Sequence, residues 1–435
     1  MKKIFFLCII GVFSLFMNSC KQTQSPEVKR LSPEGIHAVG PYLSKDHRGN
    51  TVLCWTEQNP DDSLYYLKYA VFDTQLKQFN KAIAVPATAG MSLSAESMGK
   101  IAFKDDGTVI AVFSKSFPGE KNKYAGAIYY CSSEDNGNHW SEPRFLHTDT
   151  SRTYGRSFFD VARLADGEVC AVWLDGRFGE EEKGSALFFS RTEKGEGFAR
   201  DTCLDKNTCE CCRTEILTDQ SGRIHIAYRG IQFPSGVLGK QVRDMVYTTS
   251  ADNGRTFSAA RVISKDQWEI QGCPHTGPTL AATKNALHAL WFTGGGTPGL
   301  YASSLKAGEV DFRDRVLISK SGRHPQMVEV DGKLATVWEE SLTPAQDQHK
   351  ETNTNHSNME TMNHGEGHAS SAASSQVVLT VADEEGNAKN KVLISDEKEI
   401  ADHAVITTTE RGVLIAWVQG GANDSGIFYS SQLID

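Results

Sequence analysis

The 435-residue sequence predicts an all-β fold, a β-propeller with seven blades. The first observation is a repeated motif, in which a turn is followed by an alternating apolar strand that ends in an aromatic residue. Most copies stand 47 to 63 residues apart, which leaves room for four short strands in each repeat. The second observation is that these segments lack the 3.6-residue apolar period of helices. The repeated aromatic residues are Trp55, Phe113, Trp173, Tyr228, Trp291, Trp338 and Trp417.

Each copy of the motif is interpreted as the second strand of a blade. A shorter strand before each copy would line a central channel, and strands such as 124–130 and 244–249 would follow it. The last copy is followed by only one further strand, so that blade has three strands. We expect residues 28–31 to supply its fourth strand and close the ring, because closure removes free sheet edges.

The N-terminal residues predict export and a lipid anchor. Two lysines precede an apolar run over residues 4–17, and a cysteine, Cys20, follows. This order resembles a lipoprotein signal, so we expect residues 1–19 to be a signal peptide, Cys20 to carry the lipid and residues 20–30 to form a tether. A plain secretory signal is the alternative. We therefore expect a lipoprotein of the cell envelope that faces the periplasm or the cell surface, with residues 31–435 as one propeller domain.

The charge balance excludes one class of partner. The formal net charge is −9, whereas proteins that bind nucleic acid usually present an excess of basic residues. We expect no nucleic-acid partner. After the signal, no apolar run approaches the length of a membrane span.

Two predicted hairpins carry the same motif. Residues 133–140 read Ser-Glu-Asp-Asn-Gly-Asn-His-Trp, and residues 250–257 read Ser-Ala-Asp-Asn-Gly-Arg-Thr-Phe. The aspartate can accept hydrogen bonds from the turn, the glycine can adopt a positive φ angle, and the aromatic residue can pack beneath the hairpin. The motif resembles the Asp-box, or BNR repeat, of sialidase-like β-propellers. The resemblance implies a propeller, with six blades as the alternative number, and structural roles for Asp135 and Asp252.

The same resemblance implies an exo-acting sialidase, or a related glycoside hydrolase, as an alternative function. Sialidases bind the substrate carboxylate with arginines and use a tyrosine nucleophile, so Tyr228 is the candidate nucleophile for a sialylated or acidic glycan. The strand over residues 36–42 contains no arginine where the family has its first one. Arginines that staple blades together are the other interpretation. The candidate arginines are Arg156, Arg213, Arg229, Arg243 and Arg323.

Five of the ten cysteines lie in two neighbouring segments. The order Cys-x-Cys-Cys over residues 209–212, then Tyr-Arg, Arg-Asp and finally Gly-Cys-Pro over 272–274, resembles a subgroup of sialidase-like propellers. This resemblance covers residues 202–291 closely and implies a fold more than an activity. Disulfides, for instance Cys203 with Cys209 and Cys211 or Cys212 with Cys273, are one interpretation for an exported protein. Because five is an odd number, one thiol is left over, which favours a metal or redox role.

Residues with metal-binding side chains recur where each innermost strand enters the channel. These positions hold His37, Met98 near Glu96, Arg156 with Asp160, Cys211 with Cys212, Cys273 with His275, His324, and His403 after Asp402. Equivalent positions in successive blades should meet at one mouth of the channel. The predicted metal ligands are therefore Cys209, Cys211, Cys212, Cys273, His275, His37, His324 and His403.

An insertion at about residues 345–375 gives a second metal prediction. Its polar composition cannot build a core, so we expect a disordered loop. The mixture of histidine and methionine resembles the metal-gathering tails of periplasmic copper and silver resistance proteins. Thiolate, thioether and imidazole ligands favour copper, with zinc second. A polar insertion without function is the alternative. The candidate ligands in the loop are His356, Met359, Met362, His364 and His368.

The sequence thus predicts a lipid-anchored propeller that binds a transition metal, with copper as the expected cofactor. If the cysteines form disulfides instead, no cofactor is expected. The alternatives are a sialidase-type hydrolase and a non-catalytic module that binds a glycan or a protein.

Overall fold

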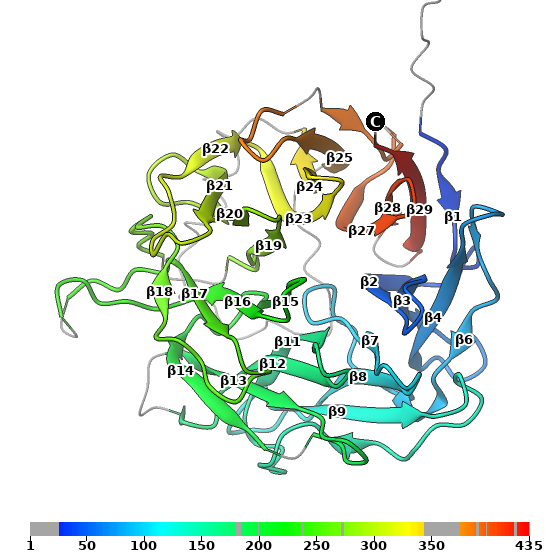
Figure 1. Ribbon diagram of the computed structural model, residues 1–435. Helices are drawn as coiled ribbons and strands as arrows, with labels where there is room; N and C mark the ends of the chain where they lie inside the picture. The colour runs from blue at the N-terminus through cyan, green and yellow to red at the C-terminus, as the bar shows by residue number, and fades with distance from the viewer. Residues whose placement is uncertain are drawn as a thin grey trace, which may run out of the picture.

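The computed structural model contains seven antiparallel sheets arranged as a ring (Figure 1). The seven-bladed propeller predicted from the repeats is confirmed, and the six-bladed alternative is wrong. One 3₁₀ turn, η1 (Pro86–Thr88), lies before blade 2, and the named elements are otherwise strands. The described residues are 26–179, 184–198, 200–236, 239–270, 274–342, 375–388, 391–396, 398–421 and 424–434.

Each blade begins with an innermost strand at the channel and adds strands outward, which Figure 1 shows as a radial order. Blade 1 contains β2 (Ala38–Lys45), β3 (Thr51–Gln58), β4 (Tyr65–Asp73) and β5 (Gln78–Phe79), and β6 (Ile83–Ala84) also pairs with β4. Blade 2 contains β7 (Lys100–Phe103), β8 (Val109–Ser116), β9 (Gly126–Ser133) and β10 (Arg144–Phe145). Blade 3 contains β11 (Arg156–Arg163), β12 (Val169–Asp175), β13 (Ser185–Arg191) and β14 (Thr202–Thr208).

The remaining blades follow the same order. Blade 4 contains β15 (Glu215–Thr218), β16 (Ile224–Arg229), β17 (Met245–Ser250) and β18 (Arg261–Val262). Blade 5 contains β19 (Thr279–Ala282), β20 (Ala286–Thr293), β21 (Gly299–Lys306) and β22 (Val316–Ser319). Blade 6 contains β23 (Gly322–Val330), β24 (Lys333–Ser341), β25 (Ser375–Ala382) and β26 (Val392–Leu393). Blade 7 contains β27 (Ala401–Thr409), β28 (Gly412–Gln419) and β29 (Gly426–Leu433).

The outer strand of blade 7 comes from the other end of the chain. Strand β1 (Lys29–Arg30) pairs antiparallel with β29, with Lys29 opposite Tyr429. The Leu31 N–H then donates to the Ile427 carbonyl at 2.8 Å. The strand expected over residues 28–31 is therefore present, and it joins the two ends of the chain in one sheet.

The repeated aromatic residues lie in the blade cores. Trp55, Trp173, Trp291 and Trp417 are at most 1% exposed, and each indole N–H has an acceptor. In three of the four, the acceptor is the side chain two residues further along, as in Trp173, which donates to Asp175 at 3.0 Å. The same strand thus buries the indole ring and supplies the hydrogen-bond acceptor for its N–H group.

The two hairpins with the shared Ser-x-Asp motif dock onto the preceding blade. Asp252 accepts from the Thr256 N–H at 2.9 Å, and Asp135 accepts from the His139 N–H at 2.8 Å. The aromatic residue that ends the second motif, Phe257, packs edge-on against Phe189 of blade 3 at 4.9 Å between ring centroids. The hairpins therefore connect neighbouring blades.

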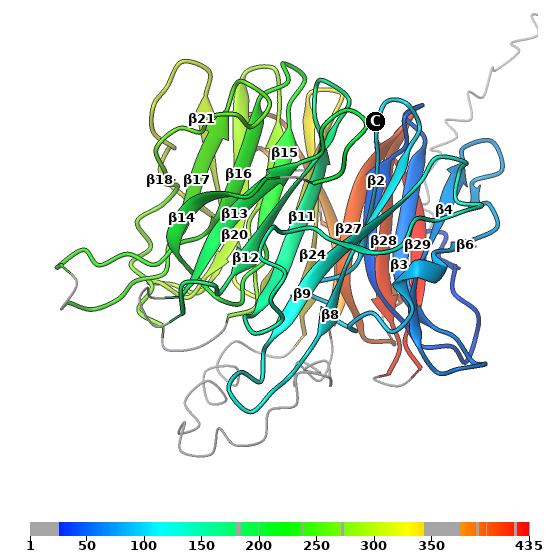
Figure 2. The same cartoon turned by 90° about the horizontal axis from the view of Figure 1, so that it is seen from below.

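Seen edge-on, the strands of all blades run through the thickness of the ring (Figure 2). Within the described ranges, no helix has the length and apolar character needed to cross a membrane.

Candidate functional site

A shared irregularity of the innermost strands shapes one mouth of the channel. The pairing register shifts near the start of β2, β11, β23 and β27. A residue with positive φ stands in each bulge: Gly40, Phe158, His324 and His403. For a residue other than glycine this conformation costs roughly 1–3 kcal/mol, and such strain tends to occur at functional sites. Bulges re-aim side chains, so this feature brings His324 and His403 to the channel mouth.

Glu96, in the connection between blades 1 and 2, is the centre of an ion network at this mouth. The Nε atom of Arg213 donates to Glu96 Oε2 at 2.6 Å. On the other carboxylate oxygen, Oε1, His403 Nε2 lies at 3.0 Å and His324 Nε2 at 3.5 Å. Since Arg213, His324 and His403 lead into blades 4, 6 and 7, one carboxylate joins four parts of the ring.

Further carboxylates hold the other side of both imidazoles. His324 Nδ1 lies 2.7 Å from Glu339 Oε2, and His403 Nδ1 lies 2.8 Å from Asp402 Oδ1. The two rings stack with centroids 5.4 Å apart and an angle of 17°. Both imidazoles thus have their ring nitrogens engaged with protein groups.

The charges of the network stabilise one another. Burial alone would lower the pKa of His403, but the charge of Asp402 and the contacts with Asp402 and Glu96 raise it well above its ordinary value. Burial would raise the pKa of Glu96, but Arg213, His324 and His403 hold it well below its usual range. A carboxylate and an imidazolium therefore coexist in the channel mouth near neutral pH.

A compact cluster of three buried cysteines follows β14. The Sγ atom of Cys209 lies 3.3 Å from that of Cys212 and 3.8 Å from that of Cys211. All three sulfur atoms lie within 4.8 Å of one another, so the cysteine trio can hold a metal ion. Arg213, the next residue after the trio, reaches Glu96, so the trio and the ion network are neighbours.

Two buried arginines donate to the trio. Arg243 Nη1 lies 3.1 Å from Cys209 Sγ, and Arg229 Nε lies 3.3 Å from Cys212 Sγ. Hydrogen bonds from Cys211 and Cys212, together with the charge of Arg243, hold the pKa of Cys209 well below its ordinary value. Burial raises the pKa of Cys212. The trio therefore offers one sulfur that ionises readily inside a basic pocket.

The disulfide suggested between Cys203 and Cys209 is absent, because both thiols are free. Cys203 stands near the start of β14 and is exposed, whereas Cys209 follows the end of that strand and is buried. On the neighbouring strand β13, Cys203 lies opposite Phe188, and Thr208, the residue before Cys209, lies opposite Ser185. Three residues of strand span about 10 Å, more than the roughly 4.4–6.8 Å between the Cα atoms of a disulfide. Cys54, Cys131 and Cys170 are free and buried in strands, as their alternating patterns indicate.

The residues considered for a sialidase do not share one open site. Arg156 is buried and pairs with Asp175 at 3.0 Å. Tyr228 is 1% exposed in the core between blades 3 and 4, and its hydroxyl donates to Asp205 Oδ2 at 2.7 Å. Arg229 and Arg243 donate hydrogen bonds to Cys212 and Cys209. Each of these candidate residues therefore contacts a protein group, and the four side chains do not converge on one open site.

Other predicted ligands are dispersed. His37 Nδ1 lies 2.9 Å from the hydroxyl of Tyr65 within blade 1. His275 contributes its carbonyl, which lies 3.1 Å from His324 Nε2. The remaining predicted positions lie outside the described residues: Cys20, Cys273, His356, Met359, Met362, His364 and His368.

A second group of ionisable residues lies deeper in the channel. Lys100 Nζ is 3.6 Å from Asp160 Oδ1, and its ammonium group lies over the ring of Tyr42 at 5.1 Å. Burial and the nearby charge of Asp160 raise the pKa of Glu215 to about 8. Of this group only Asp160 was among the residues predicted at the channel entry; Lys100 and Glu215 were not predicted.

Known proteins resemble this chain in architecture and not in sequence. No protein-family model matches the sequence, and no curated protein matches it. The polysaccharide lyase Uly1 aligns with a TM-score of 0.52 at 11% identity, over 90% of this chain and 89% of that one. A PL25 ulvan lyase bound to -[GlcA(1-4)Rha3S]- aligns with a TM-score of 0.52 at 12% identity, over 93% of both chains. The NanB sialidase of Streptococcus pneumoniae aligns with a TM-score of 0.47 at 11% identity, over 90% and 85%.

At these identities the alignments with the two lyases show the fold alone. The chain is thus a β-propeller whose architecture is similar to that of known polysaccharide lyases, and sialidases are among its structural neighbours.

Proposed function

We infer that this propeller binds a soft transition-metal ion, copper(I) in first place and zinc in second, at Cys209, Cys211 and Cys212. The observation that carries the proposal is the meeting of three buried sulfur atoms within 4.8 Å of one another. Thiolates are the ligands that copper(I) and zinc prefer. A trio that forms before the metal arrives loses little conformational freedom on binding.

The surroundings of the trio match the charge of such a complex. Three thiolates carry more negative charge than one copper(I) or zinc ion carries positive charge. Arg229 and Arg243 lie within hydrogen-bond distance of two of the sulfurs and offset this excess. Basic partners that hold metal-binding thiolates in place act as an outer shell, which typically tunes metal affinity by about 10- to 100-fold.

The position of the histidine- and methionine-rich insertion supports the same function. It joins β24 to β25, and the two strands remain paired as far as Ser341 and Ser375. Glu339, near the end of β24, contacts His324 in the ion network. The paired ends of β24 and β25 therefore stand at the mouth where the trio lies, and we propose that the imidazoles and thioethers of the insertion collect copper for the trio.

The proposed setting is the cell envelope. Lipidation at Cys20 would attach the propeller to a membrane, where exported copper-binding proteins meet the metal. Palmitate labelling of the wild-type chain and of Cys20→Ala tests this step, and loss of label in the variant is expected.

The metal proposal is tested with the reduced full-length chain in competition with a chromogenic copper(I) chelator. Cys209→Ser and Cys212→Ser should each weaken copper(I) binding by more than the roughly 10- to 100-fold typical of outer-shell changes. Cys203→Ser is the matched control, because Cys203 is free and exposed, and it should bind like the wild type. Equal affinity in all four proteins would contradict the proposal. A preference for zinc over copper(I) would reassign the metal.

A second candidate function is cleavage of an acidic glycan within the channel. The observation that favours it is the buried pair of Asp160 and Glu215, because a carboxyl group with a pKa near 8 can donate a proton at neutral pH. Fluorogenic sialosides and ulvan are the substrates to try, since structural neighbours include sialidases and an ulvan lyase. Release that disappears in Glu215→Gln would support this candidate. No release between pH 4 and 8 would remove it and leave glycan binding without catalysis.

A further inference from the structure

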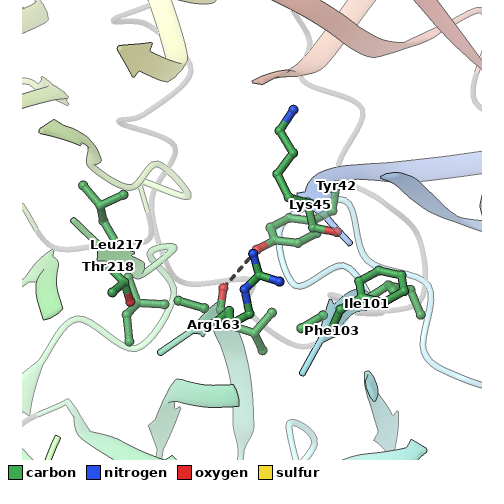
Figure 3. Close-up of a pocket in the computed structure, with 12 residues that line it drawn as sticks. Tyr42, Lys45, Ile101, Phe103, Arg163, Leu217 and Thr218 are labelled. Carbon is green, nitrogen blue, oxygen red and sulfur yellow. Dashed lines mark hydrogen bonds between the residues drawn. The ribbon is translucent and has the colours of Figure 1, made fainter. Parts of the chain in front are cut away.

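We propose that the channel has a second binding site, at the end opposite the metal site, which takes a small ligand with one carboxylate or sulfate group. The site is a cavity of about 220 Å³ between the innermost strands of blades 1 to 4. Figure 3 shows Leu217 and Thr218 on one side of it and Tyr42, Ile101 and Phe103 on the other, with Arg163 between them. This inference does not depend on the metal proposal or on cleavage of a glycan.

The topology places the cavity away from the cysteine trio. The ion network and the trio involve residues at or before the first residues of the innermost strands, such as His324 of β23 and His403 of β27. The cavity is instead lined by later residues of β2 and β11, such as Lys45 and Arg163. Since the innermost strands run side by side around the channel, these two sets occupy opposite ends.

Two hydroxyl groups in the cavity wall lack a protein partner. The Oγ atom of Ser44 and the Oγ1 atom of Thr218 are buried, and neither has a hydrogen-bond partner among the described residues. A buried polar group without a partner costs about 1–3 kcal/mol, so a ligand that supplied an acceptor to either hydroxyl would remove part of this cost. The two hydroxyls stand on blades 1 and 4, and each can donate a hydrogen bond to a polar group of a ligand in the cavity.

The cavity carries positive charge and none of its twelve lining residues is acidic. The Arg163 guanidinium lies 3.5 Å from Asp105 Oδ1, but the side chain of Asp105 is 66% exposed, so water screens this pair. Lys45 donates to Thr51 Oγ1 at 2.8 Å and to the Thr408 carbonyl at 2.5 Å, which are both neutral groups. A ligand with a negative charge would supply the counter-charge that the wall lacks.

The carboxylate that lies next to the cavity in sequence is engaged elsewhere. Asp46 accepts from the N–H groups of Arg48 and Asn50, both at 2.8 Å, in the turn between β2 and β3. Its backbone carbonyl accepts from Arg163 Nη1 at 3.2 Å. Arg163 is therefore held at the edge of the cavity by a neutral acceptor, and its remaining N–H groups can face a ligand.

The size and lining define the ligand class. About 220 Å³ corresponds to roughly seven water molecules at about 30 Å³ each, which suits one monosaccharide-sized acid. Most of the wall is apolar, from residues such as Ile101, Phe103 and Ile216. A few polar groups in an apolar wall are typical of sites for small molecules. The oxyanion would contact Arg163, the hydroxyls would bind polar groups of the ligand on their own sides of the cavity, and the apolar wall would contact the rest of the ligand.

The test measures ligand-induced thermal stabilisation of the full-length chain at constant ionic strength. The probes are sodium sulfate and D-glucuronate, and D-glucose is the neutral control. We expect saturable stabilisation by glucuronate or by sulfate, and none by glucose. Response to glucuronate alone identifies a carboxylate site, and response to sulfate alone identifies a sulfate site. If neither anion stabilises the chain saturably, the proposal is wrong.

Variants separate a built site from general attraction of anions. Thr218→Val removes a hydroxyl at nearly constant volume, so it should weaken anion binding about tenfold or more while the unliganded chain melts at the same or a higher temperature. Arg163→Gln should also weaken binding. Arg48→Gln is the matched control, because Arg48 is an exposed arginine in the adjacent turn, and it should bind within about twofold of the wild type. Equal weakening by Arg48→Gln, or a lower melting temperature of unliganded Thr218→Val, would overturn the proposal.

Discussion

At the scale of single residues, the channel mouth depends on Glu96. Its carboxylate contacts Arg213, His324 and His403 from three different blades. A buried carboxylate costs a large desolvation free energy unless it is paired and hydrogen-bonded. Arg213 and His403 therefore do more than add contacts, because they offset the negative charge of Glu96 in the channel.

Replacement of His403 by glutamine should destabilise the protein in a pH-dependent way. The folded-state pKa of His403 is raised, so its stabilisation is fully present below the ordinary value of about 6.5 and is lost as the pH rises through the raised value. The loss of unfolding free energy in His403→Gln, measured by urea denaturation, should be larger at pH 6 than at pH 9. The surrounding charged groups are Asp402, Glu96, Glu339, His324 and Arg213.

His37→Gln is the control with the opposite sign. Burial lowers the pKa of His37, so the stabilisation that depends on its neutral form is present above about 6.5 and is lost as the pH falls through the lowered value. Its replacement should cost more at pH 9 than at pH 5. An equal cost of His403→Gln at pH 6 and pH 9 would show that its charge does not support the network.

Tyr228→Phe should lower stability and leave metal binding unchanged. The substitution removes the hydroxyl that donates to Asp205 at 2.7 Å and leaves the ring in the blade core. The loss of a hydrogen bond to a charged group should reduce the unfolding free energy by about 1–3 kcal/mol, measured by chemical denaturation. Tyr124→Phe, at an exposed tyrosine, should have little effect. A Tyr228→Phe protein of full stability would contradict the buried hydrogen bond.

The sequence could predict some residues of the site and not others. The spacing of Cys209, Cys211 and Cys212 is local, so their meeting follows from the sequence alone. The roles of Glu96 and Glu339 are not readable, because their partners lie far away in the chain. The arginines considered for a substrate carboxylate illustrate the same limit, since Arg156 pairs with Asp175 only once β11 and β12 are side by side.

At the scale of elements, each blade is specified mainly by its second strand. The alternating motif predicted β12 and β20 because those strands are long and mostly apolar and carry a tryptophan two residues before their end. Outer strands such as β10 and β18 have only two residues, too few for a pattern. The bulges in the innermost strands were not predicted either, because a histidine such as His324 gives no sign in the sequence that it will adopt a positive φ.

Removal of the closing strand should weaken the ring at one place. Besides the β1–β29 pairing, Ser32 Oγ accepts from the Ile427 N–H at 2.9 Å. A chain that begins at Gly35 should lose about 2–4 kcal/mol of unfolding free energy, at about 1 kcal/mol for each hydrogen bond. Hydrogen exchange should accelerate in β29 first. A chain that begins at Glu27 is the control, and equal protection of β29 in both chains would contradict closure by β1.

At the scale of the whole molecule, the candidate metal site and the cavity proposed for an anion lie at different ends of the channel. The cysteine trio and the ion network occupy one mouth, and the cavity beside Arg163 lies toward the other. The repeats were sufficient to predict the ring because each blade buries its core against the next. The sequence could not predict which end of the channel holds the cysteine trio and which holds the cavity, because this depends on the depth of each side chain along the channel.

If the proposed function is right, the propeller itself, and not only the insertion, holds the metal. The most direct test replaces residues 342–374 with an Asn-Gly turn between Ser341 and Ser375, the paired ends of β24 and β25, then measures metal per chain by mass spectrometry after reduction and loading with copper(I). We expect close to one copper per chain, near zero in the same protein with Cys209→Ser, and no change with Cys203→Ser. No bound copper in the protein that lacks the insertion, or equal copper with and without Cys209, would contradict it.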